Sequence, residues 1–285
     1  FKNIMDDRKA TVIISFYNNK KALCMIFQSL KEEKTYNFDV IVADDGSSDD
    51  ITSWLKDYIK LLPFRVLHVW HEDKGFRKNR ILNKSIAASK TDYLIFIDGD
   101  CVPQAGFVQD HLYAAEKGVV VCGRRVELSE KYTQKLYSSP EKSTFSHVYF
   151  IPMMFRYLWF NLLGYDTDVT GKHIENGIHI KFLRNLMLKR RLEKSIIGCN
   201  FSLFKDDFKK INGFDMNYEA PAVGEDTDIE FRLNGVGIKT KALKFGAALL
   251  HLYHQELKRP SINQEIFQET VKNKAFWANN GLDKL

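Results

Sequence analysis

Residues 93–102 read YLIFIDGDCV, an apolar run that leads directly into two aspartates separated by a glycine. Three similar apolar runs precede it in the chain: TVIIS at 11–15, DVIVA at 39–43 and FRVLHVW at 64–70. Such short runs are typical of strands buried in a parallel sheet. Apolar residues at helical spacing separate them, over 20–31, 51–59 and 78–89. This alternation predicts an α/β fold with a doubly wound, mostly parallel sheet, whose ligands bind at the carboxyl ends of the strands.

Polar side chains follow these predicted strands, which places Ser15, Asp45, Asp98 and Asp100 at one edge of the sheet. The two aspartates of DGD repel each other unless a cation lies between them, and carboxylate oxygens suit Mg²⁺ or Mn²⁺. An acidic turn that caps the next helix is the alternative for this motif. Asp45 could accept a hydrogen bond from a base or a ribose, or could belong to a turn that caps a helix.

Two further motifs lie in the second half of the chain. In GEDTDIEFRL, Glu225 and Asp226 stand where a general base or a simple helix N-terminus would be expected. In LLHLYH, His251 and His254 follow an apolar strand, and either could complete a metal site or be structural.

The composition bounds the function further. The chain has 285 residues, 45% of them hydrophobic, and a net charge of +6, which describes a globular chain of one large or two small domains. No apolar stretch is long enough to span a membrane, and FKNIMDDRKA at the start does not resemble a signal peptide. The four cysteines form no CxxC pair, so we expect reduced thiols and a cytoplasmic protein. The first glycine is Gly46, which excludes a Rossmann glycine fingerprint after the first strand.

Taken in order, the motifs resemble one known family. They are VIISFYNN, VADDGSSDD, KGFRKNRILN, YLIFIDGDCV, GCNFSLFKDDFKKINGFDMNY, GEDTDIEFRL and HLYH. Over about residues 10–255 this set resembles the GT-A-fold glycosyltransferases of family 2, and its second half is similar to galactosyltransferase and chondroitin polymerase domains. The resemblance implies one GT-A domain over 1–285, with a nucleotide-sugar half, a helical insertion, an acceptor half and a helical tail. Their expected ranges are 10–128, 129–195, 196–256 and 257–285.

The resemblance also implies roles for individual residues. A UDP-sugar donor would contact Ser15, Tyr17, Asp45, Arg80, Asp98 and Gly99, with Lys74 and Arg77 near Arg80. Donor sugar would lie against 198–200 and 212–214. Mn²⁺ or Mg²⁺ would be held by Asp100, with Asp98 and with His251 or, as second choice, His254. Phe16 departs from the proline or threonine that is usual after the first strand.

The implied reaction is a single, inverting displacement, in which Asp226 deprotonates the acceptor hydroxyl and Glu225 binds the acceptor. The implied acceptor is a saccharide or a glycolipid of surface polysaccharide or lipopolysaccharide synthesis. The competing interpretations are a sugar nucleotidyltransferase, which usually has a Gly- and Arg-rich loop that SFYNNKKA lacks, and a basic nucleic-acid-binding module. We expect no nucleic-acid partner, because no recognisable binding motif is present.

Residues 145–195 match no motif. An aromatic band over 149–162 precedes a basic run of Lys181, Arg184, Lys189, Arg190 and Arg191. This pattern predicts a peripheral, salt-sensitive contact with the inner face of the cytoplasmic membrane. The alternative is a helical cover over the acceptor site, buried or used for self-association.

Overall fold

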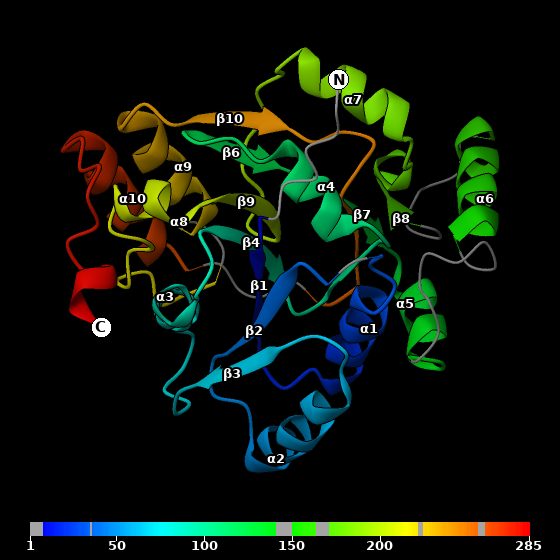
Figure 1. The fold of residues 1–285 in the computed structure, drawn as a ribbon, viewed down its shortest axis with the longest axis horizontal. Coiled ribbons are helices and arrows are strands. Elements are labelled where there is room, and N and C mark those ends of the chain that lie inside the picture. The colour runs from blue at the N-terminus through cyan, green and yellow to red at the C-terminus, as the bar shows by residue number, and fades with distance from the viewer. Residues whose placement is uncertain (1–7, 35, 141–149, 164–170, 222–224, 256–259) are drawn as a thin grey trace.

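The computed structural model describes residues 8–285 except 35, 141–149, 164–170, 222–224 and 256–259. A seven-stranded sheet forms the centre of the molecule, in the order β10-β6-β9-β4-β1-β2-β3, and a four-stranded sheet, β5-β11-β7-β8, adjoins it (Figure 1). The strands of the large sheet are β1 (Ala10–Phe16), β2 (Phe38–Asp44), β3 (Val66–Trp70), β4 (Tyr93–Asp98), β6 (Val119–Cys122), β9 (Asn200–Phe204) and β10 (Lys239–Ala242).

The large sheet is mostly parallel, as the sequence predicts. Strands β1, β2, β3 and β4 run parallel to one another, and β10 runs parallel to β6. Strand β9 is the exception, since it pairs antiparallel with both β4 and β6 and so joins the two halves of the sheet. The first four strands therefore end at one edge, where Ser15 lies opposite Asp98 and Asp44 lies opposite Trp70.

Helices cover the sheet because their apolar faces are buried against it. The helices of the first half are α1 (Lys20–Leu30), α2 (Asp49–Tyr58), α3 (Lys78–Ala88) and α4 (Phe107–Ala114). Asn19 caps α1 by accepting a hydrogen bond from the backbone N–H of Ala22. The predicted inner stripe of α3, including Ile81, Leu82 and Ile86, is buried. Burial of such stripes is the main favourable term for a fold of this kind.

The small sheet brings distant motifs together. Its strands are β5 (Cys101–Pro103), β7 (Arg124–Leu128), β8 (Gly171–Lys172) and β11 (Ala248–His251). Strand β5 follows the DGD motif at once and pairs antiparallel with β11, so that His251 lies opposite Cys101. The backbone N–H of Leu252 donates to the carbonyl oxygen of Asp100 (2.9 Å). The LLHLYH motif, with its two histidines, is thereby fixed beside the aspartates of DGD.

The described part of 129–195 contains the helices α5 (Glu130–Tyr137), α6 (Phe150–Leu162) and α7 (Lys181–Lys189), with α5 and α6 at the right and α7 at the top of the view (Figure 1). Residue 149 of the predicted band, and residues 145–148 before it, lie outside the described residues. In α6, Met153 is buried while Phe155, Leu158 and Trp159 are exposed, so the helix both covers the core and presents an apolar face. No helix in the described part of the chain is long and apolar enough to cross a bilayer.

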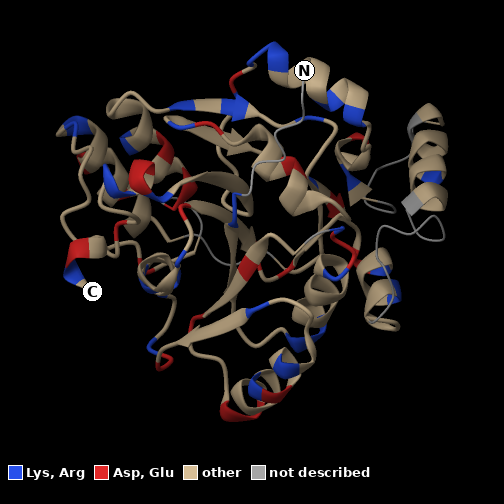
Figure 2. Ribbon diagram, in the orientation of Figure 1, with Lys and Arg blue, Asp and Glu red and all other residues tan. Residues whose placement is uncertain are grey.

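One residue of the predicted basic run does not lie on the surface. Arg184 is buried and forms an ion pair with Asp110, a residue of α4 that also contacts His179. Arg191 pairs with Glu116 at 3.0 Å. The run therefore presents fewer unpaired charges than its sequence indicates. Figure 2 shows α7, with its blue segments, at the outer edge of the fold.

The remaining helices hold the second half together: α8 (Lys205–Lys209), α9 (Asp226–Gly235) and α10 (Ile262–Lys272). Arg232 of α9 is buried and forms ion pairs with Asp228 (2.7 Å) and Asp215 (3.0 Å). It also donates to the carbonyl oxygen of Ala275, beyond α10. The predicted tail is thus docked, and the orientation of α9 is fixed by buried charges.

Candidate functional site

A cleft of about 720 Å³ opens at the carboxyl ends of β1, β2 and β4. Its lining residues include seven of the predicted site residues, namely Ser15, Tyr17, Asp45, Asp98, Gly99, Asp100 and Glu225, and also His254, the second choice as metal ligand. The cleft lies where ligands bind in parallel α/β sheets. It therefore brings together residues from both ends of the chain.

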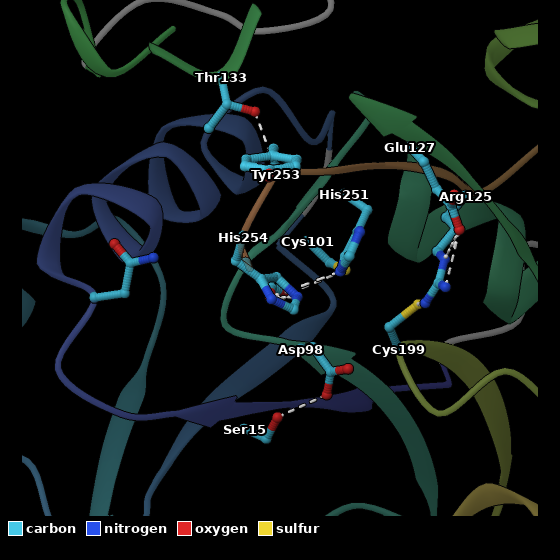
Figure 3. A network of polar contacts seen from close by, with 12 residues as sticks. Ser15, Asp98, Cys101, Arg125, Glu127, Thr133, Cys199, His251, Tyr253 and His254 are labelled. Atoms are coloured by element: carbon cyan, nitrogen blue, oxygen red, sulfur yellow. Dashed lines mark hydrogen bonds and ion pairs between the residues drawn. The ribbon is translucent and has the colours of Figure 1, made fainter. Parts of the chain in front are cut away.

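Asp98 is held in place at the floor of the cleft. Ser15 Oγ donates a hydrogen bond to Asp98 Oδ1 (2.7 Å), because β1 and β4 are paired with these two residues in register (Figure 3). A Cβ atom at Gly99 would lie 2.6 Å from the carbonyl oxygen of Ser15, so only glycine fits between the two aspartates. The close packing of β1 and β4 therefore explains both the serine and the glycine.

Lys78, at the start of α3, connects the two halves of the cleft. Its Nζ lies 2.7 Å from Asp98 Oδ1 and 2.6 Å from Glu225 Oε1. Burial alone would lower the pKa of Lys78, but the two carboxylates raise it well above its usual value. Burial raises the pKa of Glu225 to about 7, although Lys78 acts in the opposite direction. Sequence analysis missed Lys78, because a lysine at a helix start is common on protein surfaces.

Asp100, His251 and His254 form a cluster whose candidate ligand atoms all lie within 4.8 Å of one another. Nε2 of His254 is 3.3 Å and Nε2 of His251 is 3.7 Å from Asp100 Oδ2. Burial lowers the pKa of His251, which favours the neutral imidazole that binds metals. Figure 3 shows both imidazoles above Asp98, with Cys101 next to His251. The two histidines, which the sequence offered as alternatives, lie at the same place.

Asp45 follows β2 and lies in the cleft wall. Its Oδ1 is 2.5 Å from Nε2 of His71, and its Oδ2 accepts a hydrogen bond from the backbone N–H of Arg77 (2.8 Å). Tyr17 Oη donates to Asp73 Oδ2 (2.9 Å), in the same loop as His71 and Arg77. The loop after β3 is thus attached to the ends of β1 and β2, and His71 is a contact that sequence analysis did not identify.

Glu225 and Asp226 are adjacent in the chain but differ in the pockets that they line. Glu225 lines both the large cleft and a small adjoining pocket, whereas Asp226 lines the small pocket alone, with Gly198, Phe201 and Phe214. Asp226 Oδ2 accepts a hydrogen bond from the backbone N–H of Gly198 (3.2 Å). Both carboxylates are therefore within the site region, at the start of α9.

Other predicted site residues do not line the large cleft. Arg80, Lys74 and the side chain of Arg77 are not among the cleft-lining residues. Asn212 has a positive φ of 65° and binds the tail through the carbonyl oxygen of Ala278 (2.7 Å). The 212–214 segment thus contributes Phe214 alone to the small pocket.

Two asparagines of α3 hold the loop 212–215 in place. Asn83 donates to the carbonyl oxygen of Phe214 (2.8 Å) and accepts from its N–H (2.9 Å), and Asn79 donates to the carbonyl oxygen of Asp215 (2.7 Å). These buried amides clamp the loop, so the asparagines of KGFRKNRILN connect the two halves of the fold.

Two family models match the chain. Residues 11–211 match the model described as Glycosyl transferase family 2, and residues 179–255 match the one described as the N-terminal domain of galactosyltransferase. The chain is 26% identical over 255 residues to chondroitin synthase of Escherichia coli, an alignment that covers 86% of this chain and 34% of that protein. It is 25% identical over 256 residues to chondroitin synthase of Pasteurella multocida (strain Pm70), covering 86% of this chain and 24% of that protein. The chain thus spans about a third or less of these relatives.

Solved structures with the same fold are GT-A glycosyltransferases. GalNAc-T7 with UDP, GalNAc and Mn²⁺ has a TM-score of 0.61 at 14% identity, covering 92% of this chain and 48% of that chain. S. aureus TarS has a TM-score of 0.57 at 14% identity, covering 95% of this chain and 40% of that chain. These similarities identify the fold.

Proposed function

Because this chain belongs to glycosyltransferase family 2 and is a glycosyltransferase with the GT-A fold, we propose that it is an inverting, metal-dependent enzyme that uses a UDP-sugar. The transferred group is a hexose or an N-acetylhexosamine, and the acceptor is a hydroxyl of a saccharide or a glycolipid. The single observation that carries this proposal is the cleft that contains Asp45, Asp98, Asp100, Glu225 and His254.

The donor atoms beside Asp100 fit a divalent metal. One carboxylate and two imidazoles lie within reach of a common centre. Mg²⁺ prefers oxygen ligands, so two imidazole nitrogens favour a transition metal such as Mn²⁺. When bound, such an ion stabilises the negative charge of the leaving diphosphate. Asp100, His251 and His254 would hold it, with Asp98 close by.

The nucleotide would occupy the part of the cleft that Ser15, Tyr17 and Asp45 line. Lys78 would then supply a positive charge on the floor of the site, between the donor side at Asp98 and the acceptor side at Glu225. This ammonium offsets the negative charge of Asp98 and Glu225, which would otherwise repel an anionic donor in a site where few water molecules screen it. Its two carboxylate contacts keep it charged.

On the acceptor side, Asp226 acts as the general base and Glu225 orients the acceptor. Asp226 is held by the backbone N–H of Gly198, which directs one carboxylate oxygen and leaves lone pairs to accept a proton. Removal of the hydroxyl proton as the oxygen attacks the anomeric carbon requires only one base, because the leaving group is a diphosphate.

A panel of UDP-sugars tests this function directly. We expect Mn²⁺-dependent hydrolysis or transfer with one UDP-sugar, and no exchange of pyrophosphate into a nucleotide-sugar. Exchange of pyrophosphate would instead identify a sugar nucleotidyltransferase. Binding of nucleic acid without either reaction would identify a basic binding module.

The acceptor belongs, in this proposal, to bacterial surface polysaccharide or lipopolysaccharide synthesis, at the inner face of the cytoplasmic membrane. The exposed apolar face of α6, formed by Phe155, Leu158, Trp159 and Leu162, supports a peripheral contact. Lys189 and Arg190, at the end of α7, are exposed and basic, as contact with an anionic surface requires.

A further inference from the structure

We infer that His71 is a positioning residue that fixes the carboxylate of Asp45 for recognition of a nucleobase bearing a ring N–H. The inference rests on the proposed function, since it assumes a nucleotide in the cleft. It goes beyond that function because it names which residue outside the cleft determines how the base is recognised.

The sheet places the two residues side by side. Strands β2 and β3 are parallel, and Asp44 lies opposite Trp70 in their register. Asp45 and His71 are the next residues of the two strands, so they leave the sheet together. The side chain of His71 is 6% exposed and that of Asp45 is 12% exposed. The contact of 2.5 Å between Nε2 and Oδ1 is therefore largely shielded from water.

Only Asp45 faces the ligand space. Asp45 lines the cleft, whereas His71 is not among the lining residues. An ionised carboxylate can only accept, so Nε2 of His71 carries the proton in this contact. In the described part of the chain, Nδ1 of His71 is buried without a hydrogen-bond partner. The side-chain hydrogen bonding of this imidazole is therefore directed entirely at Asp45.

Both carboxylate oxygens of Asp45 accept a hydrogen bond from the protein, but the carboxylate can accept further hydrogen bonds. His71 donates to Oδ1, and the backbone N–H of Arg77 donates to Oδ2. A carboxylate offers about four lone-pair sites, so Asp45 retains capacity to accept from a ligand. With both oxygens fixed, it presents an acceptor of defined orientation to the cleft.

Such an acceptor selects the chemistry of the base. Uracil and guanine each carry a ring N–H that can donate to a carboxylate. Cytosine presents a ring nitrogen with a lone pair, which a carboxylate repels. We therefore expect UDP or GDP to bind better than CDP, and the comparison of UDP with GDP distinguishes the two sources of a ring N–H.

The chain contains a matched control for this pair. His68 Nε2 lies 2.8 Å from Oδ2 of Asp44, and Asp44 Oδ1 accepts from the backbone N–H of Ser47. Asp44 is fully buried, and neither residue of this pair lines the cleft. The Asp44–His68 pair therefore has the same chemistry as the Asp45–His71 pair without access to ligand.

The experiment measures binding of UDP, GDP and CDP with Mn²⁺ by calorimetry, in the wild type and in His71→Phe, His71→Gln and His68→Phe. We expect His71→Phe to weaken the preferred nucleotide on the order of tenfold, the effect of one hydrogen bond to a charged group, and to reduce selectivity over CDP. His71→Gln, whose amide N–H can donate to Asp45, should restore much of both. His68→Phe should lower the melting temperature and leave selectivity unchanged.

Wild-type affinity and selectivity in His71→Phe would overturn the inference while leaving the proposed function intact. Equal losses in His71→Phe and His68→Phe would also overturn it, because they would reveal a general effect on stability. A folded wild type that binds none of the three nucleotides would overturn the proposed function and this inference with it. If His71→Phe does not fold, His71→Gln and His71→Asn are compared instead. Unchanged nucleotide binding in His71→Gln together with weakened nucleotide binding in His71→Asn supports the inference. Equal losses of nucleotide binding in both variants overturn it.

Discussion

Nζ of Lys78 lies 2.6 Å from Oε1 of Glu225, although 147 positions separate the two residues in the chain. The same ammonium reaches Asp98 at the end of β4. One buried cation thus joins the first half of the chain to the second at the floor of the cleft. Without it, two carboxylates would be buried close together with no compensating charge, which is unfavourable.

The metal cluster gives the first prediction. Asp100→Ala should abolish Mn²⁺-supported binding of UDP and leave the melting temperature nearly unchanged, because the carboxylate is the only anionic member of the cluster. Asp92→Ala, an exposed aspartate before the opposite end of β4, is the control. Unchanged UDP affinity in Asp100→Ala would contradict the assignment.

His251→Ala should weaken metal dependence more than His254→Ala, since His251 is less exposed; the reverse order would make His254 the principal histidine ligand.

The second prediction concerns the general base. Asp226→Asn keeps the shape and removes the basicity, so turnover should fall by about 10²–10⁴-fold while donor binding persists. Glu225→Gln should chiefly raise the KM for the acceptor. Steady-state kinetics with donor and acceptor varied separately distinguishes the two effects. Near-normal turnover in Asp226→Asn would transfer the role to Glu225.

Buried charge in α9 gives the third prediction. Arg232 lies between Asp228 and Asp215 and is 1% exposed. Arg232→Met leaves two buried carboxylates without their partner, and we expect the free energy of unfolding to fall by about 3–5 kcal/mol. Urea denaturation measures this. Lys209→Met, which breaks an exposed pair with Asp206, should cost under about 1 kcal/mol; a similar loss in both variants would contradict the argument.

Glu33 gives a prediction about pH. Glu33 is 4% exposed, and burial raises the pKa of its carboxyl group from 4.5 to about 7. Between these values the native state holds a proton that the unfolded state has released, so this group makes stability fall as pH rises from about 4.5 to 7. Glu33→Gln can still accept from the N–H of Val108 and removes that dependence. We expect Glu33→Gln to gain up to about 3 kcal/mol relative to wild type at pH 8 and nothing at pH 4.

Thermal denaturation across pH 4–8 provides the measurement for Glu33→Gln. Glu193→Gln, at an exposed glutamate, is the control and should follow the wild-type curve. A wild-type pH dependence that survives in Glu33→Gln would show that another group is responsible.

The last prediction concerns membranes. Changing Lys189, Arg190 and Arg191 to Glu should remove binding to anionic vesicles at low salt, because each basic residue near such a surface contributes about 1 kcal/mol. Wild-type binding should weaken at high salt. The control is Lys56→Glu in the distant α2 combined with Lys60→Glu in the 3-10 turn Ile59–Leu61 that follows it (Figure 1). Vesicle co-sedimentation measures all of these, and no binding, or binding that ignores salt and lipid charge, would assign the α6 face to protein packing and favour a soluble acceptor.

Much of the first half of the fold could be predicted from the sequence. Strands such as Tyr93–Asp98 are continuous apolar runs, and the helix from Lys78 has a clear inner stripe. Local periodicity reports which face of an element is buried, and the order of the elements then limits the topology. Asp45, Asp98 and Asp100 follow strands in the sequence, so the sequence alone predicts that they share one edge of the sheet.

Long-range pairing was not predictable in this way. The antiparallel insertion of β9 between β4 and β6, and the pairing of β5 with β11, depend on contacts between segments about 80–150 residues apart. Arg184 illustrates the same point, since its sequence neighbours indicate a basic surface while Asp110 draws it into the interior. A side chain's partner is determined by packing, which local composition does not encode.

The sequence by itself determined the α/β class, the acidic edge and the family to which the chain belongs, because these follow from short motifs and their order. Only the tertiary structure decided that both histidines face Asp100, that Lys78 joins Asp98 to Glu225, and that His71 holds Asp45. Hydrogen bonds and ion pairs act over about 3 Å. The sequence order places the residues on their elements, but only the packing of those elements brings such atoms within that distance.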